Sequence, residues 1–265
     1  MIVSTDPSTA RVRHAGPSPG FVAIAYSLVF LAGLSLISPF GGKPGFPNPG
    51  DPLSALLAFF QSRGPSVRLS GALQFGAAIP LGIFTATMAS RLRFLGVRAA
   101  GAYIALFGGF AAALNLFAAG SVVWVMGSSA VTQSPAILQA LCNLAFALGG
   151  PGFSAPFGLL MAGTSVTAGF GRLLPRWIVV LGLALAVAGE LSWLALVLPM
   201  VMFLVPLTRF LGFIWLIAAG ADGLALTAFL VRLEHVVAAM VWIGLIVFVN
   251  FVLLMVLGSA DEVQR

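Results

Sequence analysis

The residues best suited to chemistry are one carboxylate and one guanidinium inside apolar stretches. Glu190 lies twelve residues into the run 178–198, and Arg209 lies about seven residues into the run 202–220. At about 1.5 Å per helical residue, Glu190 is roughly 18 Å from one face of an apolar core about 30 Å thick, and Arg209 is roughly 12 Å from the other face. These depths coincide, so we predict that the two side chains pair and offset each other's charge. The alternative is a protonated Glu190 and an Arg209 that extends outward.

A second candidate is the apolar run 138–167, which glycine and proline interrupt near its middle. The interrupting residues are Gly149, Gly150, Pro151, Gly152 and Pro156. A helix that ends at the glycines and restarts with Ser154 as its N-cap leaves backbone groups without partners at membrane depth. Such a break is tolerated only beside other protein or a polar cavity. We therefore predict a broken helix, whose new N-terminus at Ser154 favours an anion, either Glu190 or the acidic head of a substrate.

Three amide side chains fall in the outer halves of their predicted helices. They are Gln74, Asn115 and Asn143. Together with Ser154 and the charged residues they would form a polar pocket that opens outward. The alternative is that the amides only cross-link helices, each contributing about 0.6 kcal/mol.

Several kinds of site are missing from the sequence. It has no G-x-S-x-G, no H-E-x-x-H and no P-loop motif, and no cluster of His, Cys and carboxylates suited to a metal. Cys142 is the only cysteine, which excludes an intramolecular disulfide. We expect no catalytic residues, no metal and no cofactor.

The composition is that of a membrane protein. Hydrophobic residues make up 60% of the chain and charged residues 8%, with a mean hydropathy of +1.09, whereas soluble domains carry about 25% charged residues. The predicted fold is all-α, a polytopic bundle of transmembrane helices embedded in a lipid bilayer. The net charge of +6 comes from arginines in short loops, which indicate topology rather than a nucleic-acid partner.

The apolar runs predict a six-helix module over residues 21–220, followed by a seventh helix. The six runs are 21–38, 69–89, 99–126, 138–167, 178–198 and 202–220, and the seventh is 236–257. The first run could belong to a signal peptide, but we expect it to be a retained helix, because it is long and no cleavage site follows. Residues 52–62 predict a short external helix, which either lies at the membrane interface or packs on the bundle as a loop helix. We expect residues 1–20 to form a flexible cytoplasmic tail, and residues 221–265 to contain a linker, the seventh helix and a short tail. In an alternative without a chain reversal at Asp222, the last two helices would join differently.

Arginines predict the orientation of the bundle. Arg91, Arg93 and Arg98 lie in one short loop, and Arg172 and Arg176 lie in another. Loops rich in arginine are typically cytoplasmic. This places the N-terminus in the cytoplasm.

Five sequence stretches resemble an uncharacterised family of bacterial membrane proteins, the domain-of-unknown-function family 4386. They are LQFGAAIPLGIF, SRLRFLGVRAAG, GGPGFSAPFGLL, LLPRW and PLTRFLGFIWLIAAG. The resemblance covers about residues 21–220 and implies a six-helix, multi-pass protein of the bacterial inner membrane, with no assigned activity. The chain departs from the family after Gly220, where the predicted seventh helix offers a surface for a membrane-protein partner.

Three functions remain open from the sequence. The first is a non-enzymatic protein that binds or transports a small solute, apolar or anionic, at a mid-membrane site made by Glu190, Arg209 and Ser154. The second is an accessory subunit of a larger membrane complex. The third is a membrane enzyme acting on a lipid or quinone, which requires Glu190 to face an open cleft.

Overall fold

A computed structural model describes residues 16–38, 45–47, 50–96 and 99–221. Every regular element in this part of the chain is helical, which confirms the all-α prediction there. The predicted seventh helix and most of the predicted N-terminal tail lie outside the described residues.

Eight α-helices and two short 3-10 helices make up the described chain. They are α1 (Pro19–Ser35), α2 (Leu53–Phe94), α3 (Gly101–Met126), α4 (Ser129–Thr132), α5 (Pro135–Gly149), α6 (Pro151–Phe170), α7 (Arg176–Leu191), η2 (Ser192–Leu196), η3 (Pro199–Val201) and α8 (Leu204–Gly220).

Within the described residues, five helical segments are long and apolar enough to cross a membrane. They are Leu53–Phe94, Gly101–Met126, Pro135–Phe170, Arg176–Leu196 and Pro199–Gly220. The protein is therefore an integral, multi-pass membrane protein. The remaining apolar helix, α1, has 17 residues, close to the shortest length that spans a bilayer, and its crossing stays a prediction.

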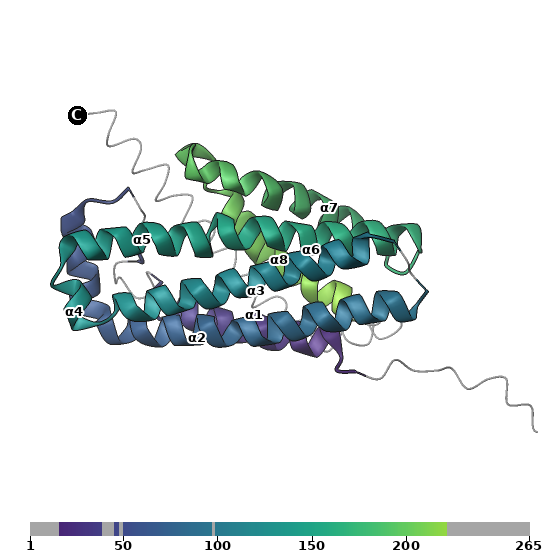
Figure 1. Ribbon diagram of the computed structural model, residues 1–265, viewed down its shortest axis with the longest axis horizontal. Coiled ribbons are helices and arrows are strands. Elements are labelled where there is room, and N and C mark those ends of the chain that lie inside the picture. Colours follow the sequence, from purple (N-terminus) through teal and green to yellow (C-terminus); the bar gives the residue numbers. More distant parts are fainter. Residues whose placement is uncertain (1–15, 39–44, 48–49, 97–98, 222–265) are drawn as a thin grey trace, which may run out of the picture.

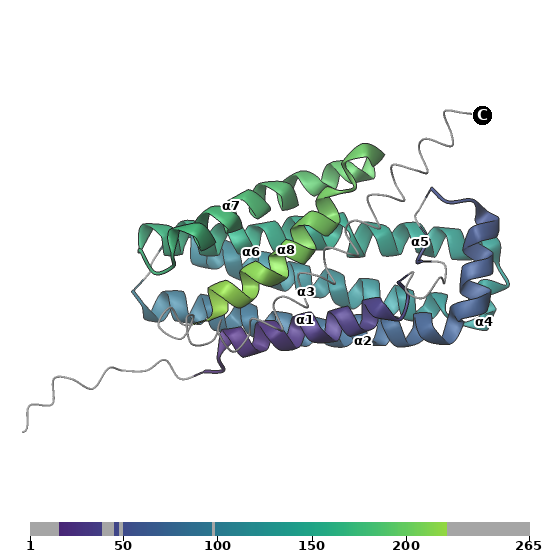
Figure 2. The same cartoon turned by 180° about the vertical axis from the view of Figure 1, so that it is seen from behind.

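Six of the helices form a closed ring. Each packs on the next in the order α1, α2, α3, α6, α7, α8, and α8 returns to α1. Figure 1 shows α2, α3 and the α5–α6 segment running side by side, and Figure 2 shows α8 crossing the bundle obliquely from α7 to α1. The large side chains Phe30, Phe84, Phe157 and Trp215 are fully buried inside this ring. The oblique course of α8 brings its last turn against the start of α1, where a Cβ built on Gly220 would lie 2.7 Å from the backbone nitrogen of Gly20.

Helix α2 is bent near its start. Its first turns lie across the end of the bundle beside α4, and the rest of the helix runs along the bundle (Figure 1, Figure 2). Pro65 lies inside α2, and a proline there removes one backbone hydrogen bond and kinks the helix. The predicted interfacial helix at 52–62 is thus the first part of α2, and its place at a membrane surface stays a prediction.

Helices α3 and α6 approach closely because their contacts are made by glycines. A Cβ atom built on Gly108 would lie 2.5 Å from the carbonyl oxygen of Pro156 and 2.6 Å from the backbone nitrogen of Leu160. A Cβ built on Gly163 would collide with the carbonyl oxygen of Gly101. Small residues at such positions let two helix backbones pack against each other within a membrane.

Candidate functional site

The long apolar segment Pro135–Phe170 is divided at Gly150. Helix α5 ends at Gly149 and α6 begins at Pro151. Pro151 has no N–H to donate to the helix before it, and the N–H groups of Phe153 and Ser154 donate to the Gly150 carbonyl at 3.2 and 2.9 Å. In an unbroken helix, the Phe153 N–H would bind the carbonyl of Gly149. The division therefore leaves the Gly149 carbonyl open to another donor.

That donor is Arg209. Its Nη2 atom donates a hydrogen bond to the Gly149 carbonyl oxygen. The guanidinium also lies 5.1 Å from the ring centroid of Phe30 and 4.6 Å from that of Phe153. The C-terminal end of a helix carries a partial negative charge, and aromatic faces attract cations, so both contacts stabilise this arginine within the apolar bundle.

The predicted cap at Ser154 is wrong. Gly150 precedes the first residue of α6, and Ser154 already lies within the helix, fully buried and with no hydrogen-bond partner for its hydroxyl among the described residues. Pro151, at the first helical position, starts the helix in place of a side-chain cap. The contact at the interruption is accordingly a cation at the end of α5, rather than an anion at the start of α6.

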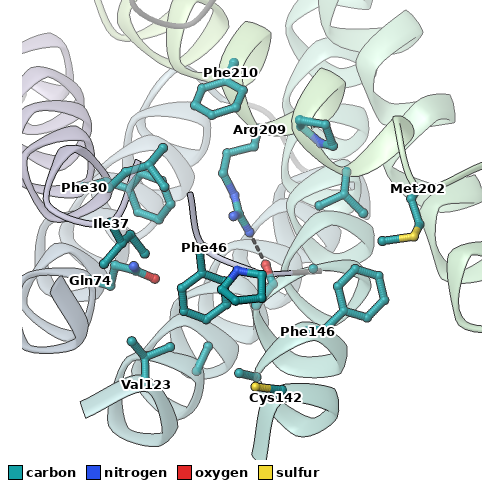
Figure 3. A pocket seen from close by; sticks show the side chains of 18 residues that line it. Phe30, Ile37, Phe46, Gln74, Val123, Cys142, Phe146, Met202, Arg209 and Phe210 are labelled. Carbon is teal, nitrogen blue, oxygen red and sulfur yellow. Dashed lines mark hydrogen bonds between the residues drawn. The ribbon is translucent and has the colours of Figure 1, made fainter. Parts of the chain in front are cut away.

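A cavity of about 250 Å3 lies beside this interruption. Figure 3 shows the Arg209 side chain extending toward its centre, with the bond to Gly149, and aromatic side chains around it. The walls come from α1, α2, α3, α5 and α8 and the segment 45–47. Its lining includes Phe30, Ile37, Phe46, Gln74, Val123, Cys142, Ala145, Phe146, Gly149, Met202, Arg209 and Phe210. Among the described lining residues, Arg209 alone carries a charge.

The cavity lies in one half of the bundle. It is lined by the last turns of α1 and α3 and by the first turns of α8. Arg91 and Arg93 end α2, and Arg176 begins α7, so these arginines lie at the opposite end of the bundle. This places the cavity in the half that the arginine pattern predicts to be external.

Glu190 lies elsewhere, against α6. A Cβ built on Gly158 would lie 3.3 Å from its Oε1, and this oxygen is buried without a hydrogen-bond partner among the described residues. Arg209 contacts α6 at Phe153, five residues earlier. At about 100° and 1.5 Å per residue, those two positions differ by about 140° around α6 and about 7.5 Å along it. Within the described chain the predicted ion pair is not formed.

We expect the stability effects of replacing Glu190 and Arg209 to be additive. When two replaced groups share no contact, their effects on the free energy of unfolding usually add to within about 0.5 kcal/mol. Reversible unfolding in mixed micelles of Glu190→Gln, Arg209→Gln and the double variant measures the coupling free energy. A coupling above about 1 kcal/mol would show that the two charges do interact.

The amide side chains do not gather at one place. Gln74 lines the cavity, and its Nε2 donates to Ser70 Oγ at 3.1 Å. Asn115 lies at the α3–α6 contact near Gly152, and its Nδ2 donates to the Ala111 carbonyl at 2.9 Å. Asn143 is exposed on α5. Of the six predicted site residues, the cavity therefore contains Arg209 and Gln74.

Sequence reasoning missed the aromatic walls and the role of the Gly149 carbonyl. Phe30, Phe46, Phe146 and Phe153 surround or contact the arginine or its cavity. The chain has 22 phenylalanines, so residue type alone does not distinguish those at the site. The carbonyl had an indirect signal in the sequence, because Pro151 cannot donate a hydrogen bond to the Ala147 carbonyl and therefore favours a break in the helix close to Gly149.

Comparisons with protein-family models, curated proteins and solved structures found no match to this chain. The resemblance to the domain-of-unknown-function family 4386 stays a prediction.

Proposed function

We propose that this protein binds a small solute within the membrane, in the cavity beside the α5–α6 interruption. The observation that carries the proposal is the combination of about 250 Å3 of space with one cationic side chain among the described lining residues, Arg209, inside an apolar bundle. Ligand sites are typically concave and mostly apolar, with a few polar groups that orient the ligand. An arginine whose only role was to donate a hydrogen bond to the Gly149 carbonyl would need no cavity beside it.

The interruption itself supports this function. Irregular backbone at membrane depth is tolerated where it is enclosed by protein or lines a cavity, and transporters often place binding sites at such breaks. Gly149 and Gly150 both line the cavity. We propose that the broken helix exists to form this site, in a bundle whose six described apolar helices cross the bilayer and precede the predicted seventh.

The orientation we propose follows the arginines. Arg91, Arg93, Arg172 and Arg176 favour a cytoplasmic location for the end of the bundle at which α1 begins. The N-terminus is then cytoplasmic, and the cavity lies nearer the outer face. The bacterial inner membrane is the location that the family resemblance implies.

The native cysteine provides a direct test. Cys142 lines the cavity and is 6% exposed. In intact membranes we expect methyl methanethiosulfonate, a small neutral reagent, to modify Cys142. Replacing Ala145, which also lines the cavity, by phenylalanine should slow the reaction about tenfold, equal to about 1.4 kcal/mol of additional opening free energy.

Ala140→Phe is the matched control, because Ala140 lies on the same helix but is exposed. It should react like the wild type. If Cys142 of the wild type reacts as slowly as Cys142 of the Ala145→Phe variant, the proposal is contradicted. In that case the closed bundle would favour the accessory-subunit alternative, in which the interior has a packing role only.

A further inference from the structure

We infer that the solute is an organic anion with an apolar body, bound with its anionic group at Arg209; this rests on the proposed binding function. The relevant chemistry is that of a carboxylate, sulfonate or phosphate monoester attached to a hydrocarbon or aromatic group.

The charge of the cavity supports an anion. Arg209 contributes a full positive charge, while the end of α5 that it contacts contributes only about −0.5 of an elementary charge. No acidic residue is among the described residues that line the cavity, and the Glu190 Oε1 lies against Gly158 instead. The cavity therefore keeps a net positive charge in a medium of low dielectric constant, where an unpaired charge is costly. A bound anion would remove that imbalance.

The donors of Arg209 are suited to this role. A guanidinium has five N–H groups, and the bond to Gly149 uses one of them, at Nη2. The Nε atom has no partner among the described residues, but it is buried and a ligand in the cavity cannot reach it. The donors that remain for a ligand are therefore on the two terminal nitrogens. Figure 3 shows these nitrogens directed into the cavity, with the Gln74 amide on one side. Gln74 has a second N–H beyond the one bound to Ser70.

The remaining walls and the volume define the rest of the ligand. Phe30, Phe46, Phe146 and Met202 present apolar surface around the arginine. An inorganic anion would leave this surface in contact with water, so an apolar body is favoured. The cavity of about 250 Å3 is slightly smaller than the range of about 300–1,000 Å3 typical of drug-sized ligands. A compact single-ring or short-chain anion fits better than a two-chain lipid.

The test compares oppositely charged reagents at Cys142, which shares the cavity with Arg209. The reagents are 2-sulfonatoethyl and 2-trimethylammonioethyl methanethiosulfonate, applied to the full chain in its membrane. The ratio of their reaction rates cancels changes in the reactivity of the thiol itself. We expect the ratio of anionic to cationic rate to fall at least about tenfold in Arg209→Gln, because a unit charge acts with opposite sign on the two reagents.

Two variants control for other effects. Arg209→Lys keeps the charge and should keep the preference for the anionic reagent. Arg176→Gln removes an equal charge from an exposed position at the start of α7, at the far end of the bundle, and should behave like the wild type.

A second measurement needs no variant. Benzoate should slow the modification of wild-type Cys142 by methyl methanethiosulfonate, whereas benzamide, its neutral counterpart, should not. Equal protection by both, or the same rate ratio in wild type and Arg209→Gln, would overturn the anion inference and leave the binding function standing. Failure of methyl methanethiosulfonate to reach wild-type Cys142 would overturn both.

Discussion

Replacing Gly108 by alanine is expected to lower the thermal unfolding temperature by about 10 °C, corresponding to about 3 kcal/mol for a chain of this size. The new Cβ would lie 2.5 Å from the Pro156 carbonyl oxygen and 2.6 Å from the Leu160 backbone nitrogen. Overpacking usually costs about 1–3 kcal/mol. Here the cost should reach the upper limit, because backbone atoms of α6 cannot rotate away as a side chain does.

Gly76→Ala is the matched control for this variant. Gly76 lies inside α2, and a Cβ built there has nothing within 4 Å. Alanine in a helix interior is favoured over glycine by up to about 1 kcal/mol, so this variant should be as stable as the wild type or slightly more stable. Unfolding followed by circular dichroism in detergent measures both. Equal unfolding temperatures for the two variants would show that the α3–α6 contact can accommodate an added methyl group at little cost.

The positions of most helices could be predicted from the sequence. The apolar runs and the arginine loops located most of the described helices, because length and hydropathy determine which segments suit a bilayer. The run 99–126 became α3, Gly101–Met126, and the run 178–198 became α7 with η2, Arg176–Leu196. The predicted interfacial helix at 52–62 did not emerge as a separate element, because the proline at position 65 bends α2 without ending it.

The site was harder to predict, because depth along a helix does not determine which neighbour a side chain faces. Glu190 and Arg209 were expected to pair because their depths coincide. The side chains instead meet different faces of α6, Glu190 at Gly158 and Arg209 at Phe153. The rotation of each helix about its own axis depends on its packing with all its neighbours, and glycine contacts such as Gly108 strongly influence that packing. This rotation cannot be deduced from a single sequence when the tertiary contacts are not known.

The second large effect is expected at the interruption itself. In the double variant Gly150→Ala, Pro151→Ala, an N–H at position 151 becomes available to the Ala147 carbonyl. In the present backbone, a Cβ on Gly150 would lie 2.5 Å from the Phe146 carbonyl oxygen, so alanine favours a change to helical geometry. Pro→Ala and Gly→Ala in a helix interior contribute up to about 3 and 1 kcal/mol. The double variant should therefore unfold at a higher temperature than the wild type.

This added stability should be accompanied by a loss of the cavity. A continuous helix directs the Phe153 N–H to the Gly149 carbonyl, which then competes with the bond from Arg209. Regular helical geometry at positions 150 and 151 also changes the position of α5 relative to α8. We expect the modification of Cys142 by methyl methanethiosulfonate to slow about tenfold, a trade of accessibility for stability that is common at functional sites.

Pro156→Ala separates the two effects. Pro156 lies inside α6, beyond the interruption, so its replacement should alter stability without changing the rate at Cys142. A double variant that is less stable than the wild type and reacts as fast would show that the surrounding helices, rather than Gly150 and Pro151, impose the interruption. A double variant that is more stable and less reactive would show that this short sequence maintains an open site at the expense of a regular helix.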